Sequence, residues 1–315
     1  VLYYILSKFG SEEAMGLENA AIMKIRQSGI ALRAQEPLAA HTSFRIGGAA
    51  EWMAFPKTAE QVRLALCAAR SAGMPVRLLG AGTNVLAPDE GVSGLVVCLK
   101  DALCGLRQLE GNRIEAMAGQ TLTSVAVFAR KNSLAGLEFA HGIPGTVGGG
   151  IFMNAGAYGG AMADVVETVT VLWPDGRLQT LDHAACAFGY RKSAFSQAEG
   201  VILSAVFRLT PGRPEEIGAR MQELMEKRRA SQPLELPSAG STFKRPEGHF
   251  AGALIQEAGL KGRGVGGAKV SEKHAGFVVN FDHATAADVR ATIALVQKTV
   301  LETSGVRLEP EVRIW

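Results

Sequence analysis

The sequence predicts an α+β protein of about two or three domains, and three observations support this expectation. The chain has 315 residues, whereas one domain usually takes about 100 to 200. Hydrophobic residues make up 47% of the chain and charged residues 20%, a balance typical of folded cores. Helix and strand signals alternate before Cys98, and short strand signals dominate after it.

The first clear helix signal is a capping box formed by Thr58 and Gln61, followed by apolar residues at helical spacing until Gly73. Residues 1–29 resemble only a weak amphipathic helix, to which no role is assigned. Apolar runs then predict buried strands at 75–79 and 94–99. Further along, a helix is predicted at 122–131 and strands are predicted at 113–117, 165–173 and 201–209.

Pro211-Gly212-Arg213-Pro214 is the clearest domain boundary, because Pro214 suits the first turn of a helix. That helix places Ile217, Met221 and Leu224 on one face. A second capping box, Thr285 with Asp288, begins a helix that Gly305 ends. The tail 306–315 is predicted to be strand.

Charge and composition exclude several functional classes. The net charge is +3 and the densest basic run is Lys227-Arg228-Arg229, which disfavours nucleic-acid or membrane partners. The four cysteines form no C-x-x-C pair, and the N-terminus has no signal pattern, so we expect reduced thiols and a cytoplasmic protein. The six histidines lack metal-ligand spacing, so we expect no metal site.

Glycine is unusually frequent, at 37 of 315 residues. The loop Gly80-Ala81-Gly82-Thr83-Asn84 could let backbone N–H groups converge on a phosphate, although a tight turn explains it at least as well. The segment from Gly142 to Gly159 contains no charged residue and has more glycines than turns need. It favours close approach of a flat ligand, with close packing between domains as the alternative. Together the two segments suggest a dinucleotide such as FAD.

Three further segments place a polar group beside glycine, proline or an aromatic residue, and they contain Arg191, Ser241 and Glu311. Spacing alone would favour an ordinary surface arginine, a serine turn and a solvated strand end. No G-x-S-x-G pattern surrounds Ser241, so a hydrolase triad has no support.

Taken in order from His41 to Arg313, these segments closely resemble the UDP-N-acetylenolpyruvoylglucosamine reductases, the MurB family. The resemblance rests on blocks along the whole of this span, namely His41-Thr42-Ser43-Phe44-Arg45-Ile46-Gly47-Gly48, the two glycine segments, Tyr190-Arg191, Gly240-Ser241, Leu260-Lys261-Gly262, Gly266-Gly267-Ala268, the run from Ser271 to Gly276, and Glu309-Pro310-Glu311-Val312-Arg313. The short connection from Arg229 to Ser241 resembles the second subtype, which lacks a tyrosine-bearing loop.

The resemblance implies an α+β, vanillyl-alcohol-oxidase-type (PCMH-type) FAD-binding fold of two domains, plus a third α/β domain that closes over the substrate. The expected boundaries are an N-terminal extension at 1–29, FAD-binding domains at 30–97 and at 98–212 with 306–315, and a substrate-binding domain at 213–305.

The family reaction reduces the enolpyruvyl ether of UDP-N-acetylglucosamine to UDP-N-acetylmuramate, a step of bacterial peptidoglycan precursor synthesis. NADPH supplies the hydride through FAD. By resemblance, Arg191 faces the substrate carboxylate, Ser241 donates a proton, and Glu311 completes the catalytic trio. We expect a monomer whose partners are NADPH and a small-molecule UDP-sugar.

The resemblance also implies binding residues. Those expected at the cofactor are Arg45, Gly80, Ala81, Gly82, Thr83, Asn84, Gly142, Ile143, Pro144, Gly145, Thr146, Gly148, Gly149, Asn154, Gly156 and Ala157. Those expected at the substrate are Tyr158, Tyr190, Arg228, Lys261 and His274. A solvated helix end is an equally good explanation of Arg228 and Arg229. Two other functions stay open: a FAD-linked oxidase of a small alcohol or hydroxy acid, and a non-catalytic nucleotide-binding module.

Overall fold

A computed structural model describes residues 11–196 and 199–315, which form two compact units. Unit 1 comprises the chain up to Glu36, Ala50–Ala81 and Ser93–Gln222. Unit 2 comprises Pro37–Ala49, Gly82–Val92 and Glu223–Trp315. Two short N-terminal segments therefore belong to the same unit as the C-terminal third of the chain. The three-domain division stays a prediction.

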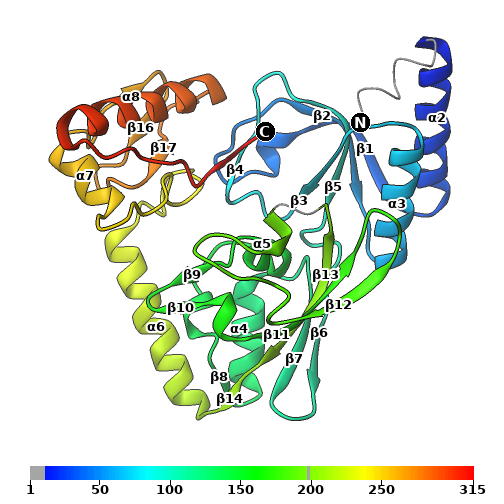
Figure 1. The fold of residues 1–315 in the computed structure, drawn as a ribbon, viewed down its shortest axis with the longest axis horizontal. Helices are drawn as coiled ribbons and strands as arrows, with labels where there is room; N and C mark the ends of the chain where they lie inside the picture. The colour runs from blue at the N-terminus through cyan, green and yellow to red at the C-terminus, as the bar shows by residue number, and fades with distance from the viewer. Residues whose placement is uncertain (1–10, 197–198) are drawn as a thin grey trace. The chain divides into compact units, whose positions relative to one another are not determined.

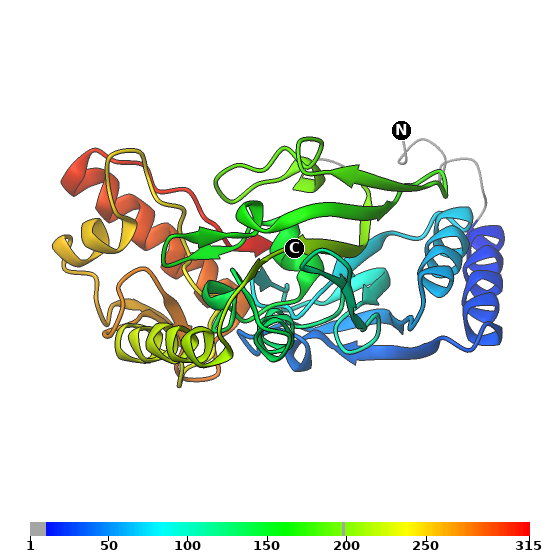
Figure 2. The ribbon, with the colours of Figure 1, turned by 90° about the horizontal axis from the view of Figure 1, so that it is seen from below.

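The first part of unit 1 is a four-stranded sheet with two helices that pack on each other. The strand order is β1 (Ala31–Pro37), β2 (Ala49–Phe55), β5 (Val92–Cys98), β3 (Val76–Leu79), and β3 pairs with β5 in parallel. Helix α2 (Ser11–Gln27) lies alongside α3 (Ala59–Ser71), as Figures 1 and 2 both show. Thr58 caps α3 by accepting a hydrogen bond from the Gln61 N–H at 3.1 Å.

The second part of unit 1 is a five-stranded antiparallel sheet with short helices. Its strand order is β12 (Leu178–Asp182), β11 (Val166–Leu172), β13 (Val201–Arg208), β7 (Arg113–Met117), β6 (Leu106–Leu109). The remaining elements are α4 (Leu122–Lys131), α5 (Val147–Phe152), and the two-stranded pairs β8 (Leu134–Ala135) with β14 (Thr210–Pro211) and β9 (Gly156–Ala157) with β10 (Gly160–Ala161).

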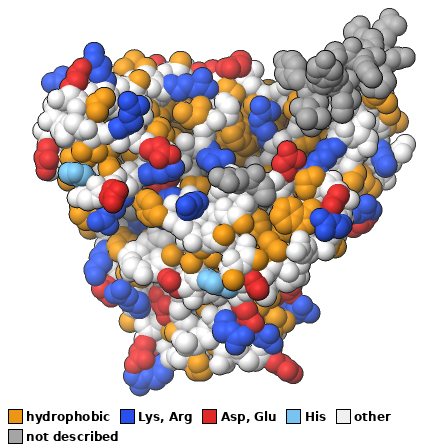
Figure 3. Space-filling model, in the orientation of Figure 1, with side chains coloured by type: hydrophobic (Ala, Val, Ile, Leu, Met, Phe, Trp, Pro, Cys, Tyr) orange, Lys and Arg blue, Asp and Glu red, His pale blue; other side chains and the backbone are white. Residues whose placement is uncertain are grey.

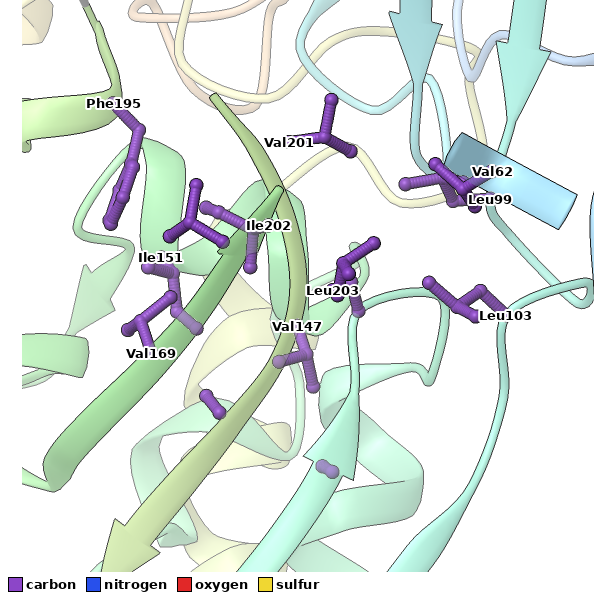
Figure 4. Packing of buried hydrophobic residues seen from close by; sticks show 14 of the residues in the cluster. Val62, Leu99, Leu103, Val147, Ile151, Val169, Phe195, Val201, Ile202 and Leu203 are labelled. Atoms are coloured by element: carbon purple, nitrogen blue, oxygen red, sulfur yellow. The ribbon is translucent and has the colours of Figure 1, made fainter. Parts of the chain in front are cut away.

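One hydrophobic core runs through unit 1. Helix α5 packs against β13, and Figure 4 shows Val147 and Ile151 of α5 near Ile202 and Leu203 of β13. Each of these side chains is buried, and burying a side chain of this size contributes roughly 1.5 to 3 kcal/mol. The α5 turn, and with it the glycine segment, is therefore anchored by the core.

Unit 2 is a three-stranded antiparallel sheet packed on a long helix. The strands are β15 (Gly264–Val265), β16 (Ala268–Val270) and β17 (Val278–Asn280), and the helices are α7 (Ala251–Glu257) and α8 (Ala286–Ser304). Strand β4 (Val85–Leu86), from the N-terminal half of the chain, pairs in parallel with β18 (Arg313–Ile314). Helix α6 (Pro214–Ser231) spans the boundary between the units.

Several predicted elements are confirmed because their signals are local. Helix α4 and strand β7 have the predicted bounds, and α6 begins at Pro214 with its three apolar residues buried. Thr285 and Asp288 form the predicted capping box of α8, and Gly305 ends that helix with a φ of 71°.

The strand prediction for the C-terminal tail needs correction, whereas the weak helix predicted near the N-terminus is present as α2. In the tail 306–315 only Arg313–Ile314 is strand, because Pro310 has no N–H to donate and the preceding residues make isolated contacts instead. At the other end, the weak helix is an integral part of unit 1, since Ile22 and Ile25 of α2 are buried in its core. Residues 1–10 of the predicted extension lie outside the described part of the chain.

Acidic and basic side chains are interspersed on the face shown in Figure 3, as the small net charge leads one to expect. Among the described residues, no helix is both long and apolar enough to cross a membrane.

The four cysteines are free and differ in exposure, which makes their reactivity a test of the fold. Burial raises the pKa of Cys98 and of Cys186 to about 11, while Cys104 is exposed. Burial and Asp101 also raise the pKa of Cys104, so its reaction should accelerate as the pH rises and the thiolate fraction grows.

We therefore predict that a maleimide reagent modifies Cys104 first in the native protein, and Cys98 and Cys186 only on unfolding. Peptide mass spectrometry after timed labelling would measure the order, with Cys104→Ser as the control that removes the fast site. Labelling of Cys98 as fast as Cys104 would contradict the placement of β5 in the core.

Candidate active site

The predicted site residues divide between the two units. Unit 1 holds Gly80, Ala81, Gly142, Ile143, Pro144, Gly145, Thr146, Gly148, Gly149, Asn154, Gly156, Ala157, Tyr158, Tyr190 and Arg191. Unit 2 holds Arg45, Gly82, Thr83, Asn84, Arg228, Ser241, Lys261, His274 and Glu311. Each unit therefore contains both expected cofactor residues and expected substrate residues.

Unit 1 brings its two glycine segments together, although they are far apart in the chain. A Cβ atom at Gly80 would lie only 2.7 Å from Thr146 Oγ1, so a side chain there would need Thr146 to move. Thr146 in turn caps α5 by accepting the Gly149 N–H at 3.3 Å. The first glycine loop therefore adjoins the start of α5.

Packing accounts for part of the glycine content between 142 and 160. A Cβ at Gly150 would lie 3.2 Å from Leu122, and one at Gly160 would lie 2.6 Å from Phe139. Gly149 differs, because it is exposed and a Cβ there would meet Thr146 Oγ1 only at 3.5 Å. The packing alternative thus holds at Gly150 and Gly160, and the exposed backbone at Gly149 is open to a ligand.

The residues of this segment fit an anionic dinucleotide. From Gly142 to Ala157 the chain contains no Asp or Glu that would repel a diphosphate. The adjoining glycine loop and the exposed Gly149 offer backbone for close approach. Gly80, Thr146 and Gly149 are the unit 1 residues best placed to line such a ligand.

Asn154 braces the glycine segment against the loop that carries Tyr190 and Arg191. Its side chain is buried, its Oδ1 accepts the Ala163 N–H at 2.9 Å, and its Nδ2 donates to the Gly189 carbonyl at 2.9 Å. Both polar atoms of the Asn154 side chain thus form hydrogen bonds within the protein, and direct contact of Asn154 with the cofactor stays a prediction.

Arg191 is half-buried and is held close to the glycine segment. Its Nη2 donates to the Gly156 carbonyl at 3.3 Å, and its guanidinium carbon lies 5.3 Å from the centroid of the Tyr190 ring. Stacking on an aromatic ring fixes the plane of a guanidinium group. The arrangement therefore orients a planar cation on unit 1.

Strained backbone conformations coincide with predicted site residues. Among the described residues, ten residues other than glycine have a positive φ, and four of them are Arg45, Asn154, Tyr158 and Arg191. Left-handed backbone at such residues costs of order 1 to 3 kcal/mol each and clusters at functional sites. Three of the four, Asn154, Tyr158 and Arg191, belong to unit 1, and their conformations support a site on that unit.

In unit 2, the chain pairs residues 242–244 with 309–311, so Thr242 lies opposite Glu311 and the segment that carries Ser241 adjoins the segment that carries Glu311. Two hydrogen bonds and one bridge make the pairing: Glu311 N to Thr242 O at 2.7 Å, Lys244 N to Glu309 O at 2.8 Å, and an antiparallel bridge between Phe243 and Pro310. Ser241 is exposed and Glu311 is half-buried. The two predicted acids therefore lie on adjoining backbone segments.

The buried residue Thr242 holds this pairing in place, and Thr242 was not identified as a site residue from the sequence. It is 1% exposed, its N–H donates to the Gly276 carbonyl at 2.8 Å, and its Oγ1 accepts the Val278 N–H at 2.9 Å. Its partners lie more than thirty residues away in the sequence, so no local pattern reveals them.

The expected cofactor loop of unit 2 has a conformation that requires glycine. Gly82 has a φ of +62°, and a Cβ there would lie 2.0 Å from the His41 carbonyl oxygen. The Gly82 carbonyl accepts the Ser43 N–H at 3.1 Å. Arg45, two residues beyond Ser43, is exposed.

The remaining predicted substrate residues lie on unit 2. His274 Nδ1 accepts the Gly276 N–H at 3.1 Å, which leaves the proton of a neutral ring on Nε2. Burial, with a smaller effect of Lys261, lowers the pKa of His274. Lys261 is exposed, and Arg228 is buried with its Nη1 donating to Gln232 Oε1 at 3.1 Å. Among the described residues, no cluster of His, Cys, Asp and Glu could hold a metal.

Comparison with known proteins identifies the family. Residues 232–315 match the C-terminal domain of UDP-N-acetylenolpyruvoylglucosamine reductase, and residues 50–182 match an FAD binding domain. Reductases of that name from Geobacillus kaustophilus and Lactiplantibacillus plantarum are 50% and 47% identical over 279 and 287 residues. These matches span 89% and 90% of this chain and 91% and 94% of the relatives.

A solved structure from Thermus caldophilus, UDP-N-acetylenolpyruvylglucosamine reductase, is 35% identical and covers 91% of this chain and 98% of its own, with a TM-score of 0.76. The predicted α+β fold, the FAD-binding domain and the resemblance are thereby confirmed. The chain belongs to the UDP-N-acetylenolpyruvoylglucosamine reductase family.

Proposed function

We propose that the chain reduces the enolpyruvyl ether of UDP-N-acetylglucosamine to the lactyl ether, giving UDP-N-acetylmuramate for peptidoglycan precursor synthesis. NADPH is the hydride donor and FAD is the bound cofactor. The observation that carries the proposal is the backbone pairing that joins the segment carrying Ser241 to the segment carrying Glu311 in a chain with an FAD-binding domain. Two proton-bearing groups on adjoining segments suit protonation of a reduced alkene.

In the proposed reaction, Arg191 stabilises the negative charge that develops on the substrate. Gly80, Thr146 and Gly149 would hold FAD, and the bound FAD would supply the hydride chemistry that links NADPH to the terminal alkene carbon of the substrate. Negative charge then develops on the adjacent carbon and carboxylate of the substrate. The fixed guanidinium of Arg191 stabilises that charge, since its orientation is held by Gly156 and Tyr190.

Protonation completes the reaction. Ser241 donates its hydroxyl proton to the carbon bonded to the ether oxygen, and Glu311 interacts with the substrate carboxylate. Arg191 belongs to unit 1, and Ser241 and Glu311 belong to unit 2.

Tyr158, Tyr190, Arg228, Lys261 and His274 are proposed to bind the UDP-sugar. Tyr158 and Tyr190 are 39% and 55% exposed, which supports a role in contact with a ligand. The short link between α6 and Ser241 supports assignment to the second subtype. The proposal also retains the three predicted domains and a cytoplasmic monomer without nucleic-acid or membrane partners.

The direct test is an anaerobic absorbance titration of the purified protein. NADPH should bleach a bound flavin at roughly one FAD per chain, and the enolpyruvyl substrate should restore the oxidised spectrum without peroxide. Acid release and chromatography would identify the flavin as FAD. Peroxide formed with a small alcohol would instead favour an oxidase, and a flavin that NADPH cannot reduce would favour a non-catalytic module.

Arg191→Lys should slow substrate-driven flavin reoxidation by about 10- to 100-fold, because one charge remains but the planar two-pronged contact is lost. Flavin content and its reduction by NADPH should change little. Stopped-flow absorbance at saturating substrate separates the two half-reactions. Arg177→Lys, on an exposed turn, is the matched control. Normal reoxidation in Arg191→Lys would place the carboxylate contact elsewhere.

Ser241→Ala should lower reoxidation by about 10²- to 10⁴-fold, the effect typical of losing a positioned general acid. NADPH should still bleach the flavin. In deuterated solvent the parent protein should place deuterium on the carbon bonded to the ether oxygen, and the variant should do so slowly. Ser231→Ala, an exposed serine at the end of α6, is the control. If Ser241→Ala reoxidises at a near-normal rate, Ser241 is not the donor and Glu311 is the next candidate.

A further inference from the structure

The expected cofactor loop and the Glu311 segment are joined within unit 2 by Asn84. The Asn84 Nδ2 donates to the Glu311 carbonyl at 3.1 Å, and the Asn84 carbonyl accepts the Arg313 N–H at 2.9 Å. Asn84 stands immediately before β4, which continues the contact by pairing with β18. One residue of the loop thus bonds to residues on both sides of Val312.

The Glu311 backbone is consequently held at two points. Its N–H donates to Thr242, the residue next to Ser241, and its carbonyl accepts from Asn84. The pairing with Thr242 sets the distance between the two predicted acids. The bond from Asn84 sets the position of that pair relative to the cofactor loop.

The loop itself is well fixed. Gly82 is buried with its left-handed backbone against His41, and Ser43 donates both to Gly82 and, through its Oγ at 2.6 Å, to the Ser238 carbonyl. Apolar side chains of the two N-terminal segments and of the acid-bearing segments share one core, namely Phe44, Ile46, Leu86, Phe243, Leu308 and Val312. The Asn84 amide is therefore presented from a rigid support.

We propose that Asn84 is a positioning residue for the proton-donating pair, in addition to any contact that its loop makes with the cofactor. This inference rests on the proposed function. Without the Asn84 amide, the Glu311 carbonyl loses a donor and the segment can shift by a fraction of an ångström. General acid catalysis is sensitive to such shifts, whereas reduction of the flavin by NADPH does not use the pair.

A matched pair of variants tests the inference. Gln297 of α8 makes the same kind of bond to the same segment, because its Nε2 donates to the Leu308 carbonyl at 2.9 Å. Asn84→Ala and Gln297→Ala each remove one amide-to-carbonyl hydrogen bond. Both proteins would be saturated with FAD, and the two half-reactions would be followed by stopped-flow absorbance.

Asn84→Ala should slow substrate-driven reoxidation about tenfold more than NADPH-driven reduction, and the solvent deuterium effect on reoxidation should rise. Gln297→Ala should change both rates by less than about twofold, even if its thermal midpoint falls as far as that of Asn84→Ala. Equal slowing of both half-reactions by Asn84→Ala, or the same reoxidation defect in Gln297→Ala, would overturn the inference. Should Asn84→Ala fail to hold FAD, Asn84→Leu keeps a similar volume while removing the donor and adding no charge, and the same split is expected.

A second readout does not depend on turnover. Hydrogen exchange of the Thr242 and Glu311 amides should be about tenfold faster in Asn84→Ala than in Gln297→Ala. Unchanged exchange in Asn84→Ala would refute a positioning role whatever reaction the protein performs. If exchange is faster in Asn84→Ala than in Gln297→Ala but the enolpyruvyl substrate does not reoxidise the flavin of the parent protein, the proposed function fails and the positioning role stands.

Discussion

The pairing of residues 242–244 with 309–311 is the contact on which the candidate site depends. Neither segment belongs to a long strand, so a few backbone hydrogen bonds and buried side chains determine their register. Thr242 secures one side through Gly276 and Val278, and Asn84 secures the other through the Glu311 carbonyl. A slip of one residue would turn the side chains of one segment to its opposite side and so change how Ser241 and Glu311 are presented.

The two units contribute different physical properties. Unit 1 offers an uncharged glycine segment and a single oriented guanidinium, which suit a dinucleotide and a developing carboxylate charge. Unit 2 offers the proposed proton donor Ser241, and Glu311, on a supported backbone. Two short N-terminal segments belong to unit 2, so the Gly82 to Asn84 loop shares a unit with Ser241 and Glu311. Cofactor binding and protonation therefore have a common support.

Local signals predicted much of the fold. The helix caps at Thr58 and Thr285 were readable because their partners lie within one helical turn, although only Thr285 forms the full capping box, since Gln61 Oε1 accepts the Lys57 N–H instead. The tail 306–315 was not, since its structure depends on contacts with residues 84–86 and 242–244. For the same reason, the resemblance indicated Ser241, Glu311 and Asn84 as site residues, but their mutual contacts emerged only from the fold. Glycine occurs in this segment for two different reasons, close packing at Gly150 and exposed backbone at Gly149, and the sequence alone does not distinguish them.

A double-mutant cycle on substrate-driven reoxidation tests the central claim, that Ser241 and Glu311 act as one unit, most directly. Ser241→Ala, Glu311→Gln and the double variant would be compared at saturating substrate with equal flavin content. The account predicts that the double variant is little slower than the slower single variant, because residues that act together are strongly non-additive. Rate losses that multiply would show that the two residues act independently, and would contradict the account.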